Sequence, residues 1–172
     1  MNYSGIIKAD FANGLGVRVT LFVSGCDLHC HGCHSPQLWD YENGVELNKE
    51  AREEIMSYLN HDWIAGITIS GGHPLDPQNI TGVYELIKEV RKRYPQKNIW
   101  LYTGYTLTPG SFSVESENII CKTLTMCDVV VDGMYDESLR DTTLAFRGSS
   151  NQLIIDVKKT IKCGRLVELN ID

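Results

Sequence analysis

Three cysteines lie within eight residues of this 172-residue chain, in the run Cys26-Asp-Leu-His-Cys30-His-Gly-Cys33. The C-x3-C-x2-C spacing lets three thiolates converge from one loop on one small metal centre. A [4Fe–4S] cube normally takes four cysteines, one for each iron, so three cysteines leave one iron with an open position. Substrates and cofactors bind at open positions of catalytic metal sites. The spacing therefore predicts an iron–sulfur centre, with Cys26, Cys30 and Cys33 as metal ligands and catalytic residues.

Two other uses of this cysteine run have to be weighed. The loop also carries His29, His31 and His34. Three cysteines and one histidine form a common structural zinc set, which would make the chain a non-catalytic zinc-binding interaction module. Structural zinc usually takes ligands from two separated segments, and the sequence has no second ligand pair with such spacing. A thioredoxin-like redox pair of Cys30 and Cys33 fits poorly, because Cys26 stands beside it and the expected order of elements is missing.

The other three cysteines are scattered, at Cys121, Cys127 and Cys163. We expect the first two to be small buried hydrophobic residues. Cys163 precedes Gly164 in a basic, turn-like stretch, so we expect it to be exposed. Six cysteines of this distribution are too few and too clustered for a disulfide scaffold.

Composition and charge exclude several classes of function. The 22 acidic and 16 basic residues give a net charge of -6, which argues against a broad nucleic-acid or anionic-membrane surface. No apolar run reaches the roughly 20 residues of a membrane span. The first eight residues lack a basic end followed by a long apolar stretch, so we do not expect them to be a signal peptide. We therefore expect a cytoplasmic protein with reduced thiols, and the length predicts a single domain over residues 1–172.

Strand-like and helix-like segments alternate along the chain. Apolar β-branched runs predict strands over 18–23, 66–70, 98–103, 128–131 and 152–157, and 166–171 could form one more. Helical periodicity predicts helices over 46–60, 79–94 and 115–126, the first capped by Asn48. This alternation is typical of an α/β fold with a mostly parallel sheet.

Several predicted strands end in glycine next to a polar residue. These ends are Ser24-Gly25-Cys26, Ser70-Gly71-Gly72, Thr103-Gly104 and Asp132-Gly133. Ligands of parallel sheets gather at the carboxyl ends of the strands. We therefore expect the four ends to line one rim together with the cysteines.

The cysteine run resembles the signature of the radical S-adenosylmethionine (SAM) superfamily. More narrowly, the chain resembles the activating proteins of anaerobic ribonucleoside-triphosphate reductases. The resemblance covers nearly the whole chain, through residues 10–16, 21–26, 70–75, 77–79, 102–105, 129–133 and 146–152. The segment Arg147-Gly-Ser-Ser-Asn-Gln152 is the one that narrows it to this family.

The resemblance implies a radical reaction. Cys26, Cys30 and Cys33 would hold a [4Fe–4S] cluster, and SAM would chelate the fourth iron. One electron, from a reduced flavodoxin-like donor, would cleave SAM to methionine and a 5'-deoxyadenosyl radical. That radical would take hydrogen from a glycine of the large reductase subunit. An activase of another glycyl-radical enzyme, such as pyruvate formate-lyase, is the alternative, but those relatives are longer.

The resemblance also assigns the SAM contacts. They fall on Gly32, Cys33, His34, Gly71, Gly72, Thr103 and Asp132. Gly71 and Gly72 would let backbone approach the methionine part of SAM, although a tight turn after a strand also needs glycine. The segment 32–34 would lie near the adenine. Asp132 would bind a ribose hydroxyl, or it could instead cap the next turn.

The sequence departs from the family pattern after the two glycines. Relatives commonly carry an acidic residue there, which holds the SAM ammonium, and often a histidine three residues on. This chain has His73 and Asp76, as if the pair were exchanged. We predict that Asp76 supplies the carboxylate, or that a neutral His73 accepts the ammonium hydrogen bond. Gly32 replaces the aromatic residue of many superfamily members, as the resemblance to this activase family implies.

Chain length bears on the fold that the resemblance implies. A complete eight-stranded barrel needs about 250 residues. A chain of 172 residues can form only a partial, open (βα) barrel of the radical SAM type. An open barrel suits a protein substrate whose glycine loop must reach the radical source.

Overall fold

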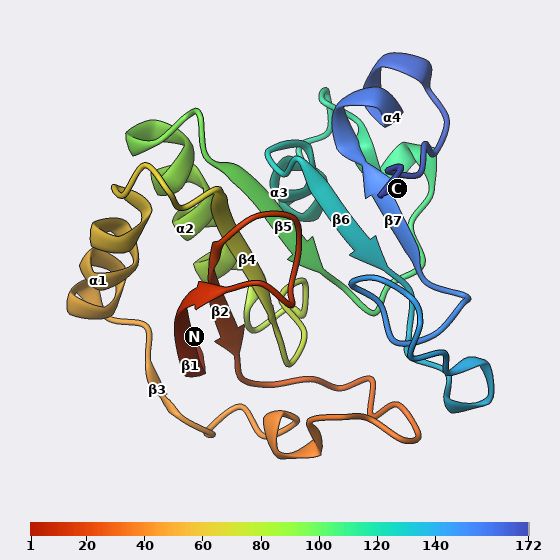
Figure 1. Ribbon diagram of the computed structural model, residues 1–172, viewed down its shortest axis with the longest axis horizontal. Coiled ribbons are helices and arrows are strands. Elements are labelled where there is room, and N and C mark those ends of the chain that lie inside the picture. Colours follow the sequence, from red (N-terminus) through yellow and green to blue (C-terminus); the bar gives the residue numbers. More distant parts are fainter. Residues whose placement is uncertain (172) are drawn as a thin grey trace.

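The computed structural model describes residues 1–171. Seven strands form one sheet in the order β3-β1-β2-β4-β5-β6-β7 (Figure 1). Their bounds are Asn2–Asp10 (β1), Arg18–Val23 (β2), Val45–Glu46 (β3), Gly66–Gly71 (β4), Asn98–Tyr102 (β5), Val129–Asp132 (β6) and Leu153–Asp156 (β7). Strands β2, β4, β5 and β6 are parallel, whereas β1, β3 and β7 pair in antiparallel fashion. The prediction of an α/β fold with a largely parallel sheet is confirmed, and the linear strand order leaves this sheet open.

Four α-helices accompany the sheet. They span Lys49–Leu59 (α1), Ile80–Arg93 (α2), Ile119–Thr125 (α3) and Val157–Cys163 (α4), with short 3-10 turns at Pro36–Leu38, Pro109–Phe112 and Glu137–Leu139. Asn48 caps α1 as predicted, because its side chain accepts a hydrogen bond from the Ala51 amide. Helix α3 begins later than predicted, since Asn118 supplies its cap.

Alternate residues of the parallel strands face opposite sides of the sheet. One side presents aliphatic residues such as Leu21, Ile69 and Leu101, which pack with Leu86 and other residues of the helices in the main core. Helices α2 and α3 lie behind the sheet in Figure 1. The other side presents polar and aromatic residues on β2, β4 and β5, namely Arg18, Thr68, Trp100 and Tyr102. Toward β6 and β7 it carries a smaller apolar cluster, in which Trp100 packs with Val131 and Ile154.

Four sequence expectations need correction or addition. Strands β1 and β3 and helix α4 were not predicted. The segment 166–171 is not a strand, and an isolated bridge joins Ile155 to Glu168. Strand β7 ends at Asp156, because the Asp156 carboxylate caps helix α4. Of the scattered cysteines, Cys127 is buried and Cys163 exposed, as predicted, but Cys121 is only half-buried. The buried stripe of α3 is centred on Thr123 and Leu124 instead.

Hydropathy gives one further finding. Within residues 1–171, no helix has both the length and the apolar character that crossing a membrane requires.

Candidate iron–sulfur and cofactor site

The cysteine loop (residues 26–34) leaves the carboxyl end of β2 and is fastened to the segment that follows it. The Gly25 amide donates to the Leu38 carbonyl at 2.9 Å, and the Cys26 amide donates to the Trp39 carbonyl at 3.1 Å. Inside the loop, the Cys33 amide donates to the Cys30 carbonyl at 3.1 Å. These bonds turn the chain back on itself directly after the strand.

The three cysteines of the loop share one cavity. Cys26 is buried, whereas Cys30 and Cys33 are half-buried, and all three are free thiols. They line a cavity of about 170 Å³. Burial raises the pKa of the Cys26 thiol, and the neighbouring Cys30 and Cys33 add to this shift.

The donor set consists of thiols, which are the ligands of iron–sulfur cubes. Within residues 1–171, no three His, Cys, Asp or Glu side chains are arranged to hold one metal ion. A cube binds each thiolate through a different iron, so its ligands lie farther apart than those around a single ion. Three thiols line one cavity here, and a cube bound by them would keep one iron for another ligand.

The carboxyl ends of the parallel strands meet at this cavity, as predicted. Its walls include Ser70, Gly71, Gly72, Thr103, Gly104 and Gly133 together with the three cysteines. Gly71 has a positive φ of 106°, and a Cβ there would lie 2.6 Å from the Val23 carbonyl oxygen. A Cβ on Gly72 would lie 2.4 Å from the Gly25 carbonyl oxygen. The double glycine therefore presses the backbone after β4 against the start of the cysteine loop, and neither position has room for a side chain.

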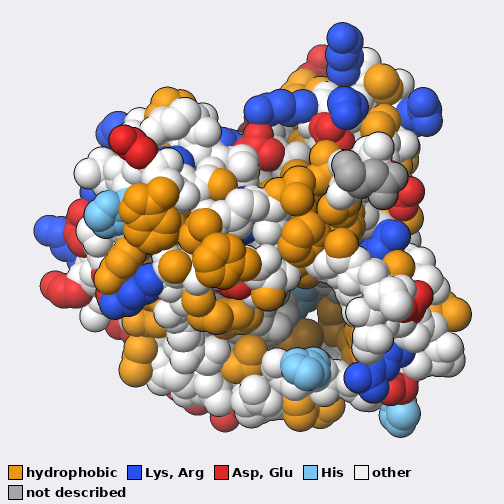
Figure 2. Space-filling model, in the orientation of Figure 1, with side chains coloured by type: hydrophobic (Ala, Val, Ile, Leu, Met, Phe, Trp, Pro, Cys, Tyr) orange, Lys and Arg blue, Asp and Glu red, His pale blue; other side chains and the backbone are white. Residues whose placement is uncertain are grey.

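A larger cavity of about 940 Å³ adjoins the first and shares Cys30, Cys33 and Gly71 with it. Gly32 and His34 also line it, so the predicted adenine-binding segment 32–34 borders this cavity, where the Glu137 side chain lies against Gly32. Its opposite wall comes from the loop between β6 and β7, through Tyr135, Glu137, Arg140, Arg147 and Gly148. Figure 2 shows this face of the molecule hollowed at lower right, with histidine and hydrophobic side chains around the hollow.

His73 lies behind the cavity wall. Its side chain is buried, and Nε2 is 2.9 Å from the Thr103 hydroxyl oxygen. Its ring meets that of Tyr105 edge-on, with centroids 4.3 Å apart. Burial lowers the pKa of His73 to about 4, so the ring is neutral at pH 7. His73 is not among the residues that line either cavity, whereas its partner Thr103 lines the smaller one.

Asp76 and Asp132 are also buried and engaged. The Asp76 carboxylate accepts hydrogen bonds from the Tyr41 hydroxyl at 2.7 Å and the Gln78 amide at 2.9 Å. The Asp132 carboxylate accepts from the Leu107 amide at 2.8 Å and the Leu153 amide at 3.1 Å. Neither residue lines either cavity. The contacts of Asp132 agree with its turn-capping alternative, and direct contacts of His73, Asp76 or Asp132 with SAM stay predictions.

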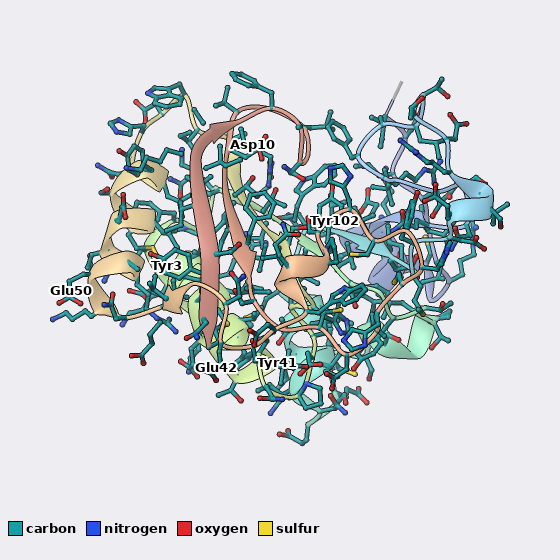
Figure 3. The ribbon with its side chains drawn as sticks, turned by 90° about the horizontal axis from the view of Figure 1, so that it is seen from below. Tyr3, Asp10, Tyr41, Glu42, Glu50 and Tyr102 are labelled. Atoms are coloured by element: carbon teal, nitrogen blue, oxygen red, sulfur yellow. The ribbon has the colours of Figure 1, made fainter. Side chains whose placement is uncertain are left out.

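Sequence reasoning missed several residues of the site. Tyr102, at the end of β5, lines both cavities, and its hydroxyl donates to the Phe146 carbonyl at 2.8 Å (Figure 3). Its place at a strand end was a signal that could have found it. Gln152 also lines both cavities. Tyr135 and Glu137 belong to an irregular loop without a local pattern, so no sequence signal marks them.

Known proteins of similar sequence also contain an iron–sulfur domain or act on a reductase, according to their names. A family model described as a 4Fe-4S single cluster domain matches residues 12–155. The activating protein of the anaerobic ribonucleoside-triphosphate reductase of Escherichia coli K12 is 38% identical over 156 residues, which cover 90% of this chain and 97% of that protein. The protein of the same name from Enterobacteria phage T4 is 40% identical over 153 residues, covering 88% and 92%. The one from Pasteurella multocida is 35% identical over 156 residues, covering 90% and 96%.

The chain belongs to the family of anaerobic ribonucleoside-triphosphate reductase-activating proteins. The match to the 4Fe-4S model includes the cysteine loop and all four parallel strands. Membership in the activating-protein family therefore supports an iron–sulfur cluster as the cofactor and confirms the resemblance seen in the sequence.

Proposed function

We propose that this chain cleaves SAM reductively and uses the resulting radical to place a glycyl radical on the large subunit of an anaerobic ribonucleoside-triphosphate reductase. One observation carries the proposal. Three free thiols spaced C-x3-C-x2-C line one cavity together with the bare backbone of Gly71 and Gly72. The names of the relatives supply the protein on which such chemistry would act.

Cys26, Cys30 and Cys33 hold a [4Fe–4S] cluster in this proposal, and one iron remains open. When bound, the cluster supplies one electron to the SAM sulfonium, and cleavage gives methionine and a 5'-deoxyadenosyl radical. The chain's own contribution begins with the thiols. They must lose their protons to bind iron, and the raised pKa of Cys26 makes that loss depend on the metal.

SAM occupies both cavities in this proposal. The backbone of Gly71 and Gly72 receives the methionine part beside the cysteines, and the segment 32–34 faces the adenine in the larger cavity. In this proposal the Thr103 hydroxyl contacts the polar end of SAM. The SAM ammonium is held by Asp76 or by a neutral His73, the latter directly or through its contact with Thr103. Asp132 either binds the ribose or only anchors its turn.

The open sheet leaves access for a protein substrate. We interpret it as a partial (βα) barrel of the radical SAM type, formed by a single domain over residues 1–172. The 940 Å³ cavity offers space beside the cofactor for the glycine loop of the reductase. A reduced flavodoxin-like protein in the cytoplasm would donate the electron.

The test uses anaerobically reconstituted protein. We expect about four irons and four sulfides per chain. After reduction in the presence of SAM, the protein should form 5'-deoxyadenosine. Cys26→Ala should lose both the cluster and the formation of 5'-deoxyadenosine. Bound zinc without iron or SAM cleavage would overturn the proposal in favour of the interaction module. A glycyl-radical EPR signal on the reductase, but not on pyruvate formate-lyase, identifies the protein substrate.

A further inference from the structure

The β6–β7 strap (residues 133–152) is an irregular segment fastened at its own base. The Gln152 side-chain oxygen accepts from the Gly148 amide at 2.9 Å, and its side-chain nitrogen donates to the Gly133 carbonyl at 3.0 Å. The Asn151 side chain donates to the Met134 carbonyl at 2.8 Å. The two ends of the strap are therefore tied together by its own side chains, without contacts from the cysteine loop.

One side chain of the strap reaches the cysteine loop. A Cβ built on Gly32 would lie 2.3 Å from Oε2 of Glu137 and 3.0 Å from its Cδ. The Glu137 carboxylate thus rests on the bare α-carbon of Gly32, which has a positive φ of 74°. Gly32 immediately precedes Cys33, so this contact falls on the backbone that aims the third thiol.

The carboxylate is itself held from two sides. The Tyr135 hydroxyl donates to Oε2 of Glu137, and Nη1 of Arg140 is 3.7 Å from Oε1. The Tyr135 ring packs against Gly148, where an added Cβ would lie 3.0 Å from it. These two contacts direct the Glu137 side chain, which is 41% exposed, toward Gly32.

We propose that Glu137 is a positioning residue, whose carboxylate bears on Gly32 and thereby fixes the direction in which Cys33 presents its thiolate to the cluster. The proposal rests on the proposed function, in which Cys33 is a cluster ligand. The loop needs such support because it is largely exposed and lies outside helices and strands. The strap supplies it from across the cavity, so cofactor binding depends on a segment more than a hundred residues away along the chain.

The first experiment uses the iron-free protein and does not depend on SAM chemistry. Hydrogen exchange of the Cys33 amide, which donates to the Cys30 carbonyl, should become about tenfold faster in Glu137→Ala, because the support is gone. Glu137→Gln keeps the shape and the bond from Tyr135, so it should restore slow exchange. Unchanged exchange in Glu137→Ala would overturn the proposal, as would equally fast exchange in the Gln variant.

Gly32 supplies the reciprocal variant and a matched control. Gly32→Ala should loosen both the cysteine loop and the strap, and its effect should be smaller when Glu137→Ala is already present, because the clash is then removed. Gly164 has a similar positive φ of 64°, but nothing lies within 4 Å of its added Cβ. Gly164→Ala therefore measures backbone strain alone and should leave the cysteine loop unchanged. Strictly additive effects of the two changes would contradict the contact.

The second experiment uses cluster-loaded protein and measures iron release to a chelator. Release should be about tenfold faster in Glu137→Ala than in the wild type, and Glu137→Gln should restore slow release. Equal release rates in wild type and Glu137→Ala would overturn the role toward the cluster. A wild-type protein that binds no iron would defeat the proposed function itself, whereas the exchange result on iron-free protein would still stand.

Discussion

On the face of the sheet that the helices cover, β2, β4 and β5 present Leu21, Ile69 and Leu101, all fully buried among aliphatic neighbours. On the opposite face the same strands present Arg18, Thr68 and Trp100. The first face buries methylene groups, which favours folding through the hydrophobic effect. The second face buries a guanidinium group, which costs free energy unless hydrogen bonds compensate for it.

The buried guanidinium group belongs to Arg18, and its contacts hold a loop of the site in place. The side chain is fully buried, and burial lowers its pKa to about 10. Nε donates to the Thr68 hydroxyl at 2.7 Å, and Nη1 donates to the Leu15 carbonyl at 2.9 Å. The guanidinium also lies over the Trp100 ring, 5.3 Å from its centre. These contacts fasten the loop of residues 11–17, whose Asn13 lines the larger cavity. The helix-covered face therefore supplies stability, and the open face uses part of it to build the site.

The largest expected effect separates activity from stability. Cys30→Ala removes one of the three thiols, so SAM cleavage should fall below detection, since a cluster held by two cysteines is not retained. The iron-free variant should unfold at the wild-type denaturant concentration, because Cys30 is half-buried and outside the core. Iron analysis and 5'-deoxyadenosine assays measure the loss of activity, and urea titration measures the stability. A large loss of stability in the iron-free variant would break the contrast between the faces.

Leu86→Ala is the reverse experiment on the helix-covered face. Leu86 is fully buried on α2, so its truncation should cost about 2–5 kcal/mol of unfolding free energy. SAM cleavage per folded, cluster-loaded molecule should stay at the wild-type level, because Leu86 touches neither cavity. Urea unfolding measures the loss of stability, and assays of SAM cleavage, normalised to the amount of cluster, measure the activity. A reduced rate in the fully folded fraction would show that the two faces are coupled.

His73 lies where the two faces meet and gives a pH-dependent effect. Its pKa is about 4 in the folded protein and about 6.5 in the unfolded chain, because burial outweighs the opposing charge of Asp76. Only the unfolded chain takes up this proton between those values. Stability is therefore fully present above pH 6.5 and should fall by about 2–3 kcal/mol between pH 7.5 and 4.5.

Urea titrations across that range measure the loss. His73→Gln carries no titrating ring, so its unfolding free energy should depend less on pH in the same interval. An unchanged pH dependence in this variant would assign the loss to other groups.

The sequence predicted those parts of the molecule whose chemistry lies in local spacing. The cysteine run, the Gly71-Gly72 turn and the aliphatic strands each carry their own pattern, and the structure brings them to one rim. Strand β1 was not predicted from the sequence. Its pairing with β2 is interrupted by irregularities between Tyr3 and Gly5 and between Ile7 and Asp10. Most of its residues are at least partly exposed, so no clear alternation marks it.

The position of the β6–β7 strap at the site was not predicted either, for a different reason. Glu137 reaches the site only because the β6–β7 connection folds back over a loop near the other end of the chain. No periodicity encodes that approach. The same holds for His73 and Asp76: their types were noticed in the sequence, but only the structure shows that His73 contacts the Thr103 hydroxyl and that Asp76 accepts from the Tyr41 hydroxyl.

Tyr102→Phe gives the smallest expected effect and refines the contrast on the open face. The Tyr102 hydroxyl donates to the carbonyl of Phe146, which has a positive φ of 57° and therefore needs support from outside its own backbone. The Phe146 ring also meets Trp100 edge-on, with centroids 5.4 Å apart. Loss of one hydrogen bond should cost about 1 kcal/mol of unfolding free energy.

The functional effect of Tyr102→Phe should exceed its effect on stability. Phe146 adjoins Arg147 and Gly148, which line the larger cavity, so a loosened segment there should weaken SAM binding while the aromatic ring still fills the wall. We expect a severalfold higher KM for SAM with little change in kcat. Tyr58→Phe is the matched control, since Tyr58 packs beside the main core and lines neither cavity. Equal effects of the two substitutions on KM would show that the open face does not set cofactor affinity through this contact.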